Sequence, residues 1–301
     1  MATTRPTHAS GVTPQSFVYL QKLLLRRTGT LLEAGKEYVV ETRLHGLAAG
    51  EGFGSVAALL EGLQTEEESG PLHGKVTEAM LNGETSFFRD LYPFDALRDT
   101  LLPELIAKRE TGRTLNIWSA ATASGQEAYS LAMMLTESFP QLAGWRIRLI
   151  ASDVSESMLS RARAGVYSQI EVNRGLPARL MLKHFDRDAA EWRLQPGVRQ
   201  MVEFQKINLA APWPSLPPMD IVLMRNVLLY FSAETRKAIL AQVMKTLRPD
   251  GYLFLGGGET TMITERSFES VRVGKAMCYR VVRSETARPK NVGENPGGHE
   301  S

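Results

Sequence analysis

The stretch from Leu115 to Leu135, LNIWSAATASGQEAYSLAMML, constrains the fold of this chain more than any other. It begins with an apolar run at 115–118, which is too short for a helix and is typical of a buried strand. Small residues follow at 119–125, and then apolar residues recur at helical spacing, namely Ala128, Leu131, Ala132 and Leu135. A strand, a small-residue turn and a helix N-terminus form a cradle in which backbone N–H groups point at a ligand.

The residue types in this turn indicate which ligand suits it. Phosphate loops carry G-x-x-x-x-G-K-[ST], and dinucleotide loops carry G-x-G-x-x-G. This turn has one glycine, Gly125, no lysine after it, and Glu127 in the first turn of the helix. A carboxylate there would repel a phosphate but suits a cationic group, such as the amino group of S-adenosylmethionine (SAM). Glu127 would also complement the helix dipole, and the stretch alone leaves both interpretations open.

Composition excludes several classes of protein. With 43% hydrophobic residues and a net charge of +2, the chain is an ordinary globular protein whose charge gives no argument for nucleic acid. The single cysteine, Cys278, excludes a disulfide framework or a cysteine-based zinc cluster, and a buried inert thiol is expected. No apolar run approaches the ~20 residues of a membrane span, and no signal-peptide core is present. We therefore expect a cytoplasmic protein without a metal site and without direct membrane insertion.

The first eighty or so residues carry helical patterns and no strand pattern. Residues 1–12 are polar and predicted to be disordered, and Thr13 and Pro14 fit an N-cap and the first position of a helix. Further helices are predicted over Tyr38–Ala49, Ser55–Leu63 and Val76–Leu81, the last after a break at Gly70-Pro71. We expect residues 13–82 to form a helical domain. Its polar faces mix basic and acidic side chains, which fits either a solvated surface or a weakly basic surface for an acidic partner helix.

From about residue 100 the pattern changes to alternating strands and helices. Strands are predicted over 115–118, 145–152, 220–224 and 252–255, with closing strands within 271–282. Asp153 ends the second strand, at the position where a Rossmann-type sheet binds ribose hydroxyls. It could also cap the next helix, and the two roles are compatible. Ser232 is expected to cap a helix that runs to Leu247.

The segment between the second and third of these strands is less regular. Trp192–Leu194, a turn at Gln195–Gly197, and Val198–Phe204 are predicted to form a hairpin, because Pro-Gly favours a turn. We expect a small antiparallel insertion over about 166–206. Residues 284–301 are polar and rich in Gly, Pro and Glu, which predicts a disordered tail.

Several longer blocks occur in a fixed order along the chain. They are ETSFFRD, WSAATASGQEAYSLAM, ASD followed by a helix and GVY, RNVLLYF, and LRPDGYLFLGGGE. With these blocks the chain resembles the chemotaxis receptor methyltransferase (CheR) family of bacterial SAM-dependent protein-glutamate O-methyltransferases, over about residues 14–282. The resemblance implies an α/β fold of the class I SAM-dependent methyltransferases, with a Rossmann-like doubly wound sheet in 83–283. A small helical N-terminal domain and a small antiparallel β insertion would accompany that sheet.

The resemblance also assigns site residues. SAM would be the cofactor, with no metal, and its binding residues would be Thr85, Arg89, Ala121, Gly125, Glu127, Asp153, Asn208, Leu209, Asn226 and Val227. Arg89 and Tyr230 would lie near the transferred methyl and the substrate carboxylate, so we expect these two to be the catalytic residues.

Three departures from the family pattern suggest a divergent member. Gly83 stands where the family usually has Asn, two residues before the Thr of the FFR block, with Asn82 displaced by one. The loop at 122–128 is TASGQEA instead of C-S-T-G-E-E-P, and Gly257-Gly258 replaces His-Ser before a Glu. The first change could weaken SAM affinity, whereas the second keeps Glu127.

The resemblance implies methyl transfer to glutamates on the cytoplasmic methylation helices of a chemoreceptor, which the helical domain would contact. A glutamate, with an ordinary pKa of about 4.3, is already an anion at neutral pH, so no general base is needed. Two alternatives stay open, a SAM-sensing interaction module with little catalysis and a methyltransferase for another substrate. Nucleic acid is not expected as a partner, because Arg225–Leu228 is not the [DNS]-P-P-[YF] tetrad typical of enzymes that methylate nucleic-acid amino groups.

Overall fold

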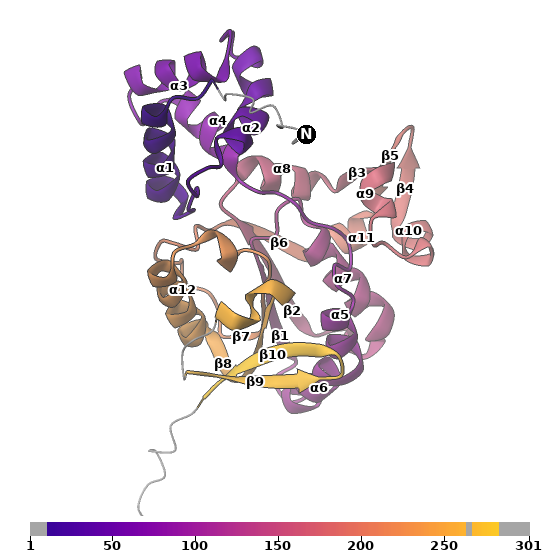
Figure 1. The fold of residues 1–301 in the computed structure, drawn as a ribbon. Coiled ribbons are helices and arrows are strands. Elements are labelled where there is room, and N and C mark those ends of the chain that lie inside the picture. The colour runs from indigo at the N-terminus through magenta and orange to yellow at the C-terminus, as the bar shows by residue number, and fades with distance from the viewer. Residues whose placement is uncertain (1–10, 263–266, 283–301) are drawn as a thin grey trace, which may run out of the picture.

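The computed structural model describes residues 11–262 and 267–282 of the chain. The predictions of disorder for residues 1–10 and for the tail from 284 lie outside the described residues. Four N-terminal helices stand at one end of an α/β unit, and a small second sheet projects from the side of that unit (Figure 1). Within the described ranges, none of the helices combines the length and the apolar character that a membrane span requires.

Helices α1 to α4 form the N-terminal part of the chain. Their bounds are α1 Pro14–Thr28, α2 Glu37–Gly50, α3 Val56–Thr65 and α4 Pro71–Met80. The hydroxyl of Thr13 accepts the N–H of Ser16 and caps α1, as predicted. Pro71 begins α4 and does not break a helix, because a proline at the first position leaves no N–H without a partner. The four apolar faces share one core, which also buries Val12 from the segment that we expected to be disordered.

His73 lies fully buried in this helical core, with its Nε2 2.7 Å from the Tyr19 hydroxyl. Burial lowers the pKa of His73 below its ordinary value of 6.5. The unfolded chain therefore binds the proton more tightly than the folded chain does. The contribution of neutral, buried His73 to the free energy of unfolding is present above about pH 6.5 and is lost as the pH falls below that value. We expect the midpoint of thermal unfolding, measured by circular dichroism, to decrease when the pH is lowered from 7 to 5. The variant His73→Leu should show a shallower pH dependence, and equal slopes would contradict the prediction.

The α/β unit is built on a seven-stranded sheet in the order β6-β2-β1-β7-β8-β10-β9. The strands are β1 Thr114–Ala120, β2 Arg146–Asp153, β6 Val202–Lys206, β7 Met219–Met224, β8 Leu247–Leu255, β9 Phe268–Val273 and β10 Ala276–Val281. Neighbours from β6 to β8 pair in parallel, whereas β10 is antiparallel to β8 and β9. The chain enters the sheet at the interior strand β1, builds β2 and β6 on one side of it, and then crosses to β7 and β8 on the other side, so the predicted doubly wound sheet is confirmed. β8 begins five residues earlier than predicted, at Leu247. Its pairing register with β7 shifts between Met219 and Ile221.

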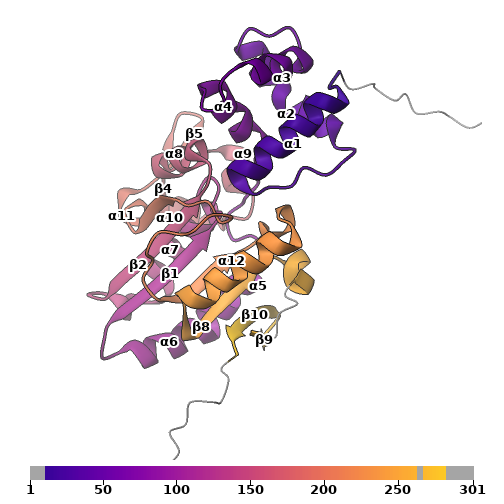
Figure 2. The same cartoon turned by 90° about the vertical axis from the view of Figure 1, so that its left-hand side faces the viewer.

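Helices cover both faces of this sheet (Figures 1 and 2). One face carries α5 Tyr92–Ala96, η1 Leu97–Leu101, α6 Leu102–Arg109 and α7 Gln126–Ser138, and the other carries α12 Ala233–Thr246. Successive strand residues alternate between the two cores: Ile117 packs on the α7 side and Trp118 on the α12 side. The Ser232 hydroxyl accepts the N–H of Thr235 and caps α12, as predicted.

A second sheet of three antiparallel strands follows α8 (Glu156–Ala164). It consists of β3 Val166–Ser168, β4 Phe185–Asp188 and β5 Glu191–Leu194, accompanied by α9 Gln169–Asn173 and α10 Ala178–His184. An antiparallel insertion is therefore present, but the predicted hairpin is wrong. β5 pairs with β4 and β3, and β6 instead joins the main sheet beside β2. Pro196 opens the short helix α11 (Pro196–Arg199), because proline suits the first helical position as well as it suits a turn.

Candidate active site

A cavity of about 770 Å³ lies where the N-terminal helices meet the carboxyl ends of the parallel strands. Part of its wall comes from the carboxyl ends of β1, β2, β6 and β7: Ala121–Ala123, Asp153-Val154, Ile207–Leu209 and Arg225–Val227. The end of α1 and the segment to Lys36 that follows it also line the cavity, together with side chains of α2, the linker after α4, and residues 229–233. Doubly wound sheets bind ligands at this edge, because parallel strands bring their carboxyl ends together there.

Almost all predicted site residues line this cavity. They are Thr85, Arg89, Ala121, Glu127, Asp153, Asn208, Leu209, Asn226, Val227 and Tyr230. Gly125 does not lie in the wall. It precedes α7 in the left-handed conformation, with φ +92°, and an added Cβ would lie 3.0 Å from the Cβ of Ala162. Gly125 therefore shapes the turn, and the prediction that it contacts the ligand is not supported by its position.

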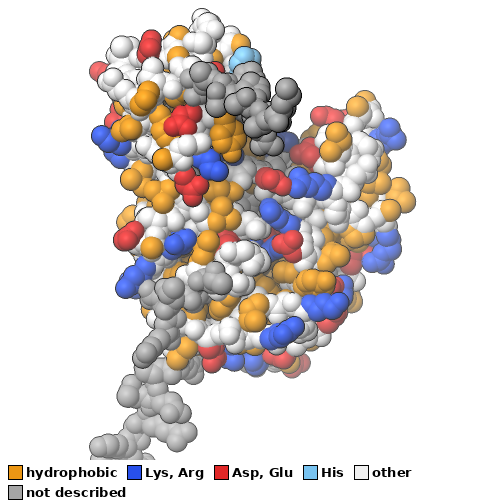
Figure 3. Space-filling view, viewed as in Figure 1, with side chains coloured by type: hydrophobic (Ala, Val, Ile, Leu, Met, Phe, Trp, Pro, Cys, Tyr) orange, Lys and Arg blue, Asp and Glu red, His pale blue; other side chains and the backbone are white. Residues whose placement is uncertain are grey.

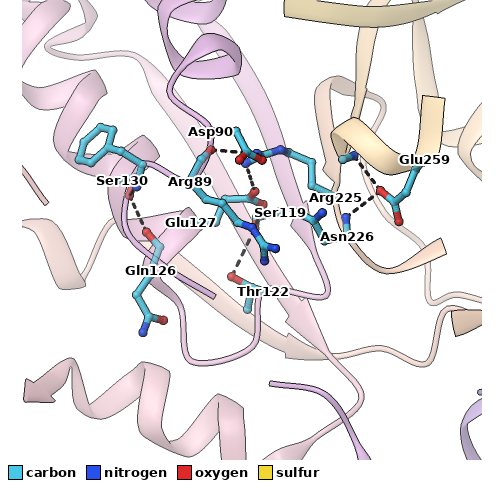
Figure 4. A network of polar contacts seen from close by, with 12 residues as sticks. Arg89, Asp90, Ser119, Thr122, Gln126, Glu127, Ser130, Arg225, Asn226 and Glu259 are labelled. Carbon is cyan, nitrogen blue, oxygen red and sulfur yellow. Dashed lines mark hydrogen bonds and ion pairs between the residues drawn. The ribbon is translucent and has the colours of Figure 1, made fainter. Parts of the chain in front are cut away.

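Glu127, the carboxylate predicted in the first turn of α7, is held in an ion pair. Its Oε2 accepts from Nη1 of Arg225 at 2.9 Å, and its Oε1 accepts from the Ser119 hydroxyl at 2.8 Å. Nη2 of Arg225 donates to Asp90 Oδ2 at 2.7 Å and to the carbonyl of Arg89 at 2.8 Å. Figure 4 shows the Arg225 side chain between the two carboxylates. Glu127 and Arg225 line the cavity, whereas Asp90 does not. Each oxygen of Glu127 can still accept a further hydrogen bond, as from the N–H groups of a cationic ligand.

Arg225 lies in the segment 225–230 that the sequence places at the carboxyl ends of the strands, but it is not among the predicted site residues. Its side chain is only 2% exposed, so the guanidinium is buried with Glu127, whose side chain is 12% exposed. One signal was available, because Arg225 directly follows the buried strand β7, at the edge of the sheet where ligands bind. Its partner lies 98 positions away in the sequence, and no local pattern connects the two.

Arg89 points a second guanidinium at the cavity. It lines the wall and donates to the carbonyl of Glu84 at 3.3 Å, and it has no ion pair with a carboxylate among residues 11–262 and 267–282. An Arg without a carboxylate partner is free to bind the carboxylate of a ligand or substrate.

Asp153 and Asn208 line the wall after β2 and β6. The carboxylate of Asp153 accepts the N–H groups of Ala123 at 2.8 Å and Ser155 at 2.9 Å, and burial raises its pKa above the ordinary value. Ser155, not Asp153, provides the side chain that caps α8, so the capping interpretation of Asp153 is wrong. Each Asp153 oxygen can accept more than one hydrogen bond, which leaves capacity for ribose hydroxyls. Asn208 donates its amide to the carbonyl of Arg27 at 3.0 Å, and so contacts the end of α1.

Backbone strain is concentrated around the cavity. Three loops at its edge contain non-glycine residues with positive φ: Phe88 (46°), Asp90 (61°), Leu91 (21°), Ala121 (55°), Ala123 (51°) and Asn226 (59°). Such conformations cost about 1–3 kcal/mol each and persist only where the surroundings fix them, which is typical of binding and catalytic sites.

Comparison with known proteins identifies the family. The family model described as "CheR methyltransferase, SAM binding domain" matches residues 83–277. This chain belongs to the CheR methyltransferase family. Similar curated proteins include chemotaxis protein methyltransferase 1 of Pseudomonas aeruginosa, which is 39% identical and covers 87% of this chain and 96% of the relative. Chemotaxis protein methyltransferase Cher2 of Pseudomonas putida is 35% identical, and the match covers 88% of this chain and 97% of the relative. Chemotaxis protein methyltransferase 1 of Vibrio cholerae is 34% identical, and the match covers 90% of this chain and 98% of the relative.

The family makes the protein a SAM-dependent methyltransferase, and the residues of the cavity fit SAM. The carboxylate of Glu127 suits the cationic groups of SAM, Asp153 suits hydroxyls, and Arg89 suits a carboxylate. Among solved structures, the glycopeptide N-methyltransferase MtfA complexed with SAM matches with a TM-score of 0.30 at 15% identity, covering 50% of this chain and 47% of that one. Within the described part of the chain, His, Cys, Asp and Glu form no group of three or more that could hold a metal.

Segments of the N-terminal part hold Tyr230 of this methyltransferase from two sides. The N–H of Leu31 donates to the Tyr230 carbonyl at 2.8 Å, and the side-chain amide of Asn82 donates to the Tyr230 hydroxyl. The carboxylate of Glu78 on α4 accepts the N–H of Glu156 at 2.9 Å, at the start of α8. The helices are thus attached directly beside the cavity. On the face seen in Figure 3, acidic and basic side chains are interspersed and form no continuous basic stripe.

Proposed function

We propose that the enzyme transfers the methyl group of SAM to glutamate side chains of a bacterial chemoreceptor and forms glutamate methyl esters. The observation that carries this proposal is the position of the cavity, between the N-terminal helices and the carboxyl ends of the parallel strands, where doubly wound sheets bind ligands. Helices beside the cavity suit a helical protein substrate, and Lys36 and Arg43 in the wall suit an acidic one. The relatives named as chemotaxis protein methyltransferases point to the same substrate class.

The proposed reaction needs little acid–base chemistry from the enzyme. The acceptor glutamate is anionic at neutral pH, given its ordinary pKa of about 4.3. When bound, SAM would supply a methyl group on a positively charged sulfur: a carboxylate oxygen attacks the methyl carbon, the S–CH3 bond breaks, and neutral S-adenosyl-L-homocysteine leaves. The described wall of the cavity contains no histidine or cysteine that would serve as a base. The enzyme then acts by placing the carboxylate in line with the methyl, an effect worth up to about 7–11 kcal/mol.

The wall residues would divide this task. Glu127, fixed by Arg225, would hold the amino group of SAM, and Asp153 would hold its ribose hydroxyls. Arg89 would bind a carboxylate, of SAM or of the substrate. A close bidentate clamp on the attacking carboxylate would lower its reactivity, so we assign the positioning of the acceptor to Tyr230, whose hydroxyl Asn82 holds.

A labelling experiment tests this function. The enzyme is incubated with methyl-labelled SAM and the cytoplasmic fragment of a chemoreceptor, and the product is treated with mild base. We expect the label to leave as volatile methanol, because carboxyl methyl esters are base-labile. A fragment whose methylation-helix glutamates are replaced by alanine is the control and should take up no label. Base-stable label would mean another substrate class, and SAM binding without any transfer would favour the sensing module.

A further inference from the structure

Glu259 lies outside the cavity wall, but its fully buried carboxylate supports the loop that carries Arg225 and Tyr230. Its Oε2 accepts the N–H groups of Asn226 and Gly256, both at 2.7 Å. Its Oε1 accepts the N–H of Leu228 at 2.7 Å, with a longer contact of 3.4 Å from the N–H of Leu229. Figure 4 shows the Glu259 side chain against the backbone at Asn226.

The N–H groups that Glu259 binds would otherwise lack partners. Strand β7 ends at Met224, and Asn226 is left-handed, with φ +59°, so its N–H is outside the β-ladder. Leu228 begins the turn η3 (Leu228–Tyr230), and the first N–H groups of a helical turn have no partner within it. A buried donor without a partner is costly, and a carboxylate forms strong, charge-assisted bonds with such donors. One side chain therefore fixes the backbone N–H groups of Asn226 and Leu228.

The support for this loop is itself rigid. A Cβ added to Gly256 would lie 2.6 Å from Nδ2 of Asn226 and 2.8 Å from Oε2 of Glu259, so the two loops pack with no space between them. Glu259 belongs to the turn η4 (Gly257–Met262), and the hydroxyl of Tyr279 on β10 donates to the carbonyl of Thr260 in that turn at 3.1 Å. The position of Glu259 is thereby tied to the sheet.

We propose that Glu259 is a positioning residue for methyl transfer. It holds segment 225–230 so that Arg225 reaches Glu127 and Tyr230 faces the acceptor. The expected effect of Glu259 on turnover rests on the function proposed above, whereas its expected effect on the loop does not.

The variant Glu259→Gln tests the proposal, because it keeps the shape of the side chain and turns one acceptor oxygen into an N–H donor. That donor would face the backbone N–H groups of the loop. We expect kcat for methyl transfer to a receptor fragment to fall by about 100-fold, since small misplacements of reacting groups have effects of this size. The dissociation constant for SAM, measured by calorimetry, should also rise, because the same loop carries Arg225, which fixes Glu127. We expect this rise to be smaller than the loss in kcat, less than tenfold, because Asp153 lines the cavity from another loop.

Asp220→Asn is the matched control. Asp220 is also a fully buried carboxylate, and it accepts the N–H of Asn116 at 2.8 Å and pairs with Arg109 at 2.9 Å. It lies at the start of β7, at the opposite edge of the sheet from the cavity. This variant should melt at a lower temperature yet keep its kcat within twofold of the wild type. A kcat of Glu259→Gln within threefold of the wild type, or an equal loss in Asp220→Asn, would overturn the proposal.

Amide hydrogen exchange tests the effect of Glu259 on the loop without any substrate. The N–H groups of Asn226 and Leu228 should be protected in the wild type and should exchange at least tenfold faster in Glu259→Gln. Gly256→Ala, which pushes the same two loops apart, should accelerate the same amides. If the wild type methylates no receptor fragment, the proposed function fails while the exchange result still stands. Unchanged exchange in both variants would overturn the positioning role itself.

Discussion

Replacing Tyr230 with phenylalanine is expected to lower kcat for methyl transfer by about 100-fold and to leave the SAM dissociation constant within threefold of the wild type. Only the hydroxyl is lost, and the Leu31 N–H still binds the Tyr230 carbonyl, so the loop keeps its place. A loss in kcat without a loss in cofactor binding is the mark of an interaction made in the transition state, and 100-fold corresponds to about 2.7 kcal/mol. Single-turnover transfer from labelled SAM, together with calorimetric SAM binding, measures both quantities.

Two further variants control this experiment. Tyr252→Phe removes a hydroxyl from the buried strand β8, outside the cavity wall, and should leave turnover unchanged. Asn82→Ala removes the partner of the Tyr230 hydroxyl and should lower kcat by a smaller factor, about tenfold. Combined with Tyr230→Phe it should add no further loss, because both changes act through the same hydroxyl. Equal losses of turnover and SAM affinity in Tyr230→Phe would refute the role assigned to Tyr230.

The position of the cavity could be predicted from sequence because a parallel sheet simplifies the problem. Each buried apolar run is a strand, and the residue after it must lie at the shared carboxyl edge. Glu127, Asp153 and Asn226 could therefore be placed in one site although they come from separate loops. The same reasoning identified Gly125 but could not distinguish its possible roles, since a glycine that permits a left-handed turn and a glycine that approaches a ligand have the same sequence signal.

Pairing between distant segments was the part that sequence could not supply. The pair of Arg225 with Glu127 and the contact of Asn82 with Tyr230 depend on how β7 and the helical part meet the rest of the chain. The failed hairpin has the same origin. Residues 198–204 carry a strand pattern, but whether that strand pairs with β5 or with β2 is decided by the packing of the whole sheet.

The Arg225–Glu127 pair should make the largest single contribution to stability in the site. Replacing Arg225 with methionine keeps most of its volume but leaves Glu127 buried without its cation. Breaking a buried pair on one side costs about 3–5 kcal/mol. For a chain of this size that corresponds to a drop of roughly 5–8 °C in Tm, and methyl transfer should be lost with it.

A surface pair and a double variant make this prediction testable. Arg163 pairs with Glu156 at 2.7 Å, closer than the 2.9 Å of Arg225 and Glu127, but their side chains are 45% and 52% exposed. Arg163→Met should therefore change stability by less than about 1 kcal/mol. Adding Glu127→Gln to Arg225→Met removes the unpaired buried charge of Glu127. The double variant should therefore regain much of the lost Tm without regaining activity. An equal effect of Arg225→Met and Arg163→Met on Tm would show that burial of the pair does not decide its contribution.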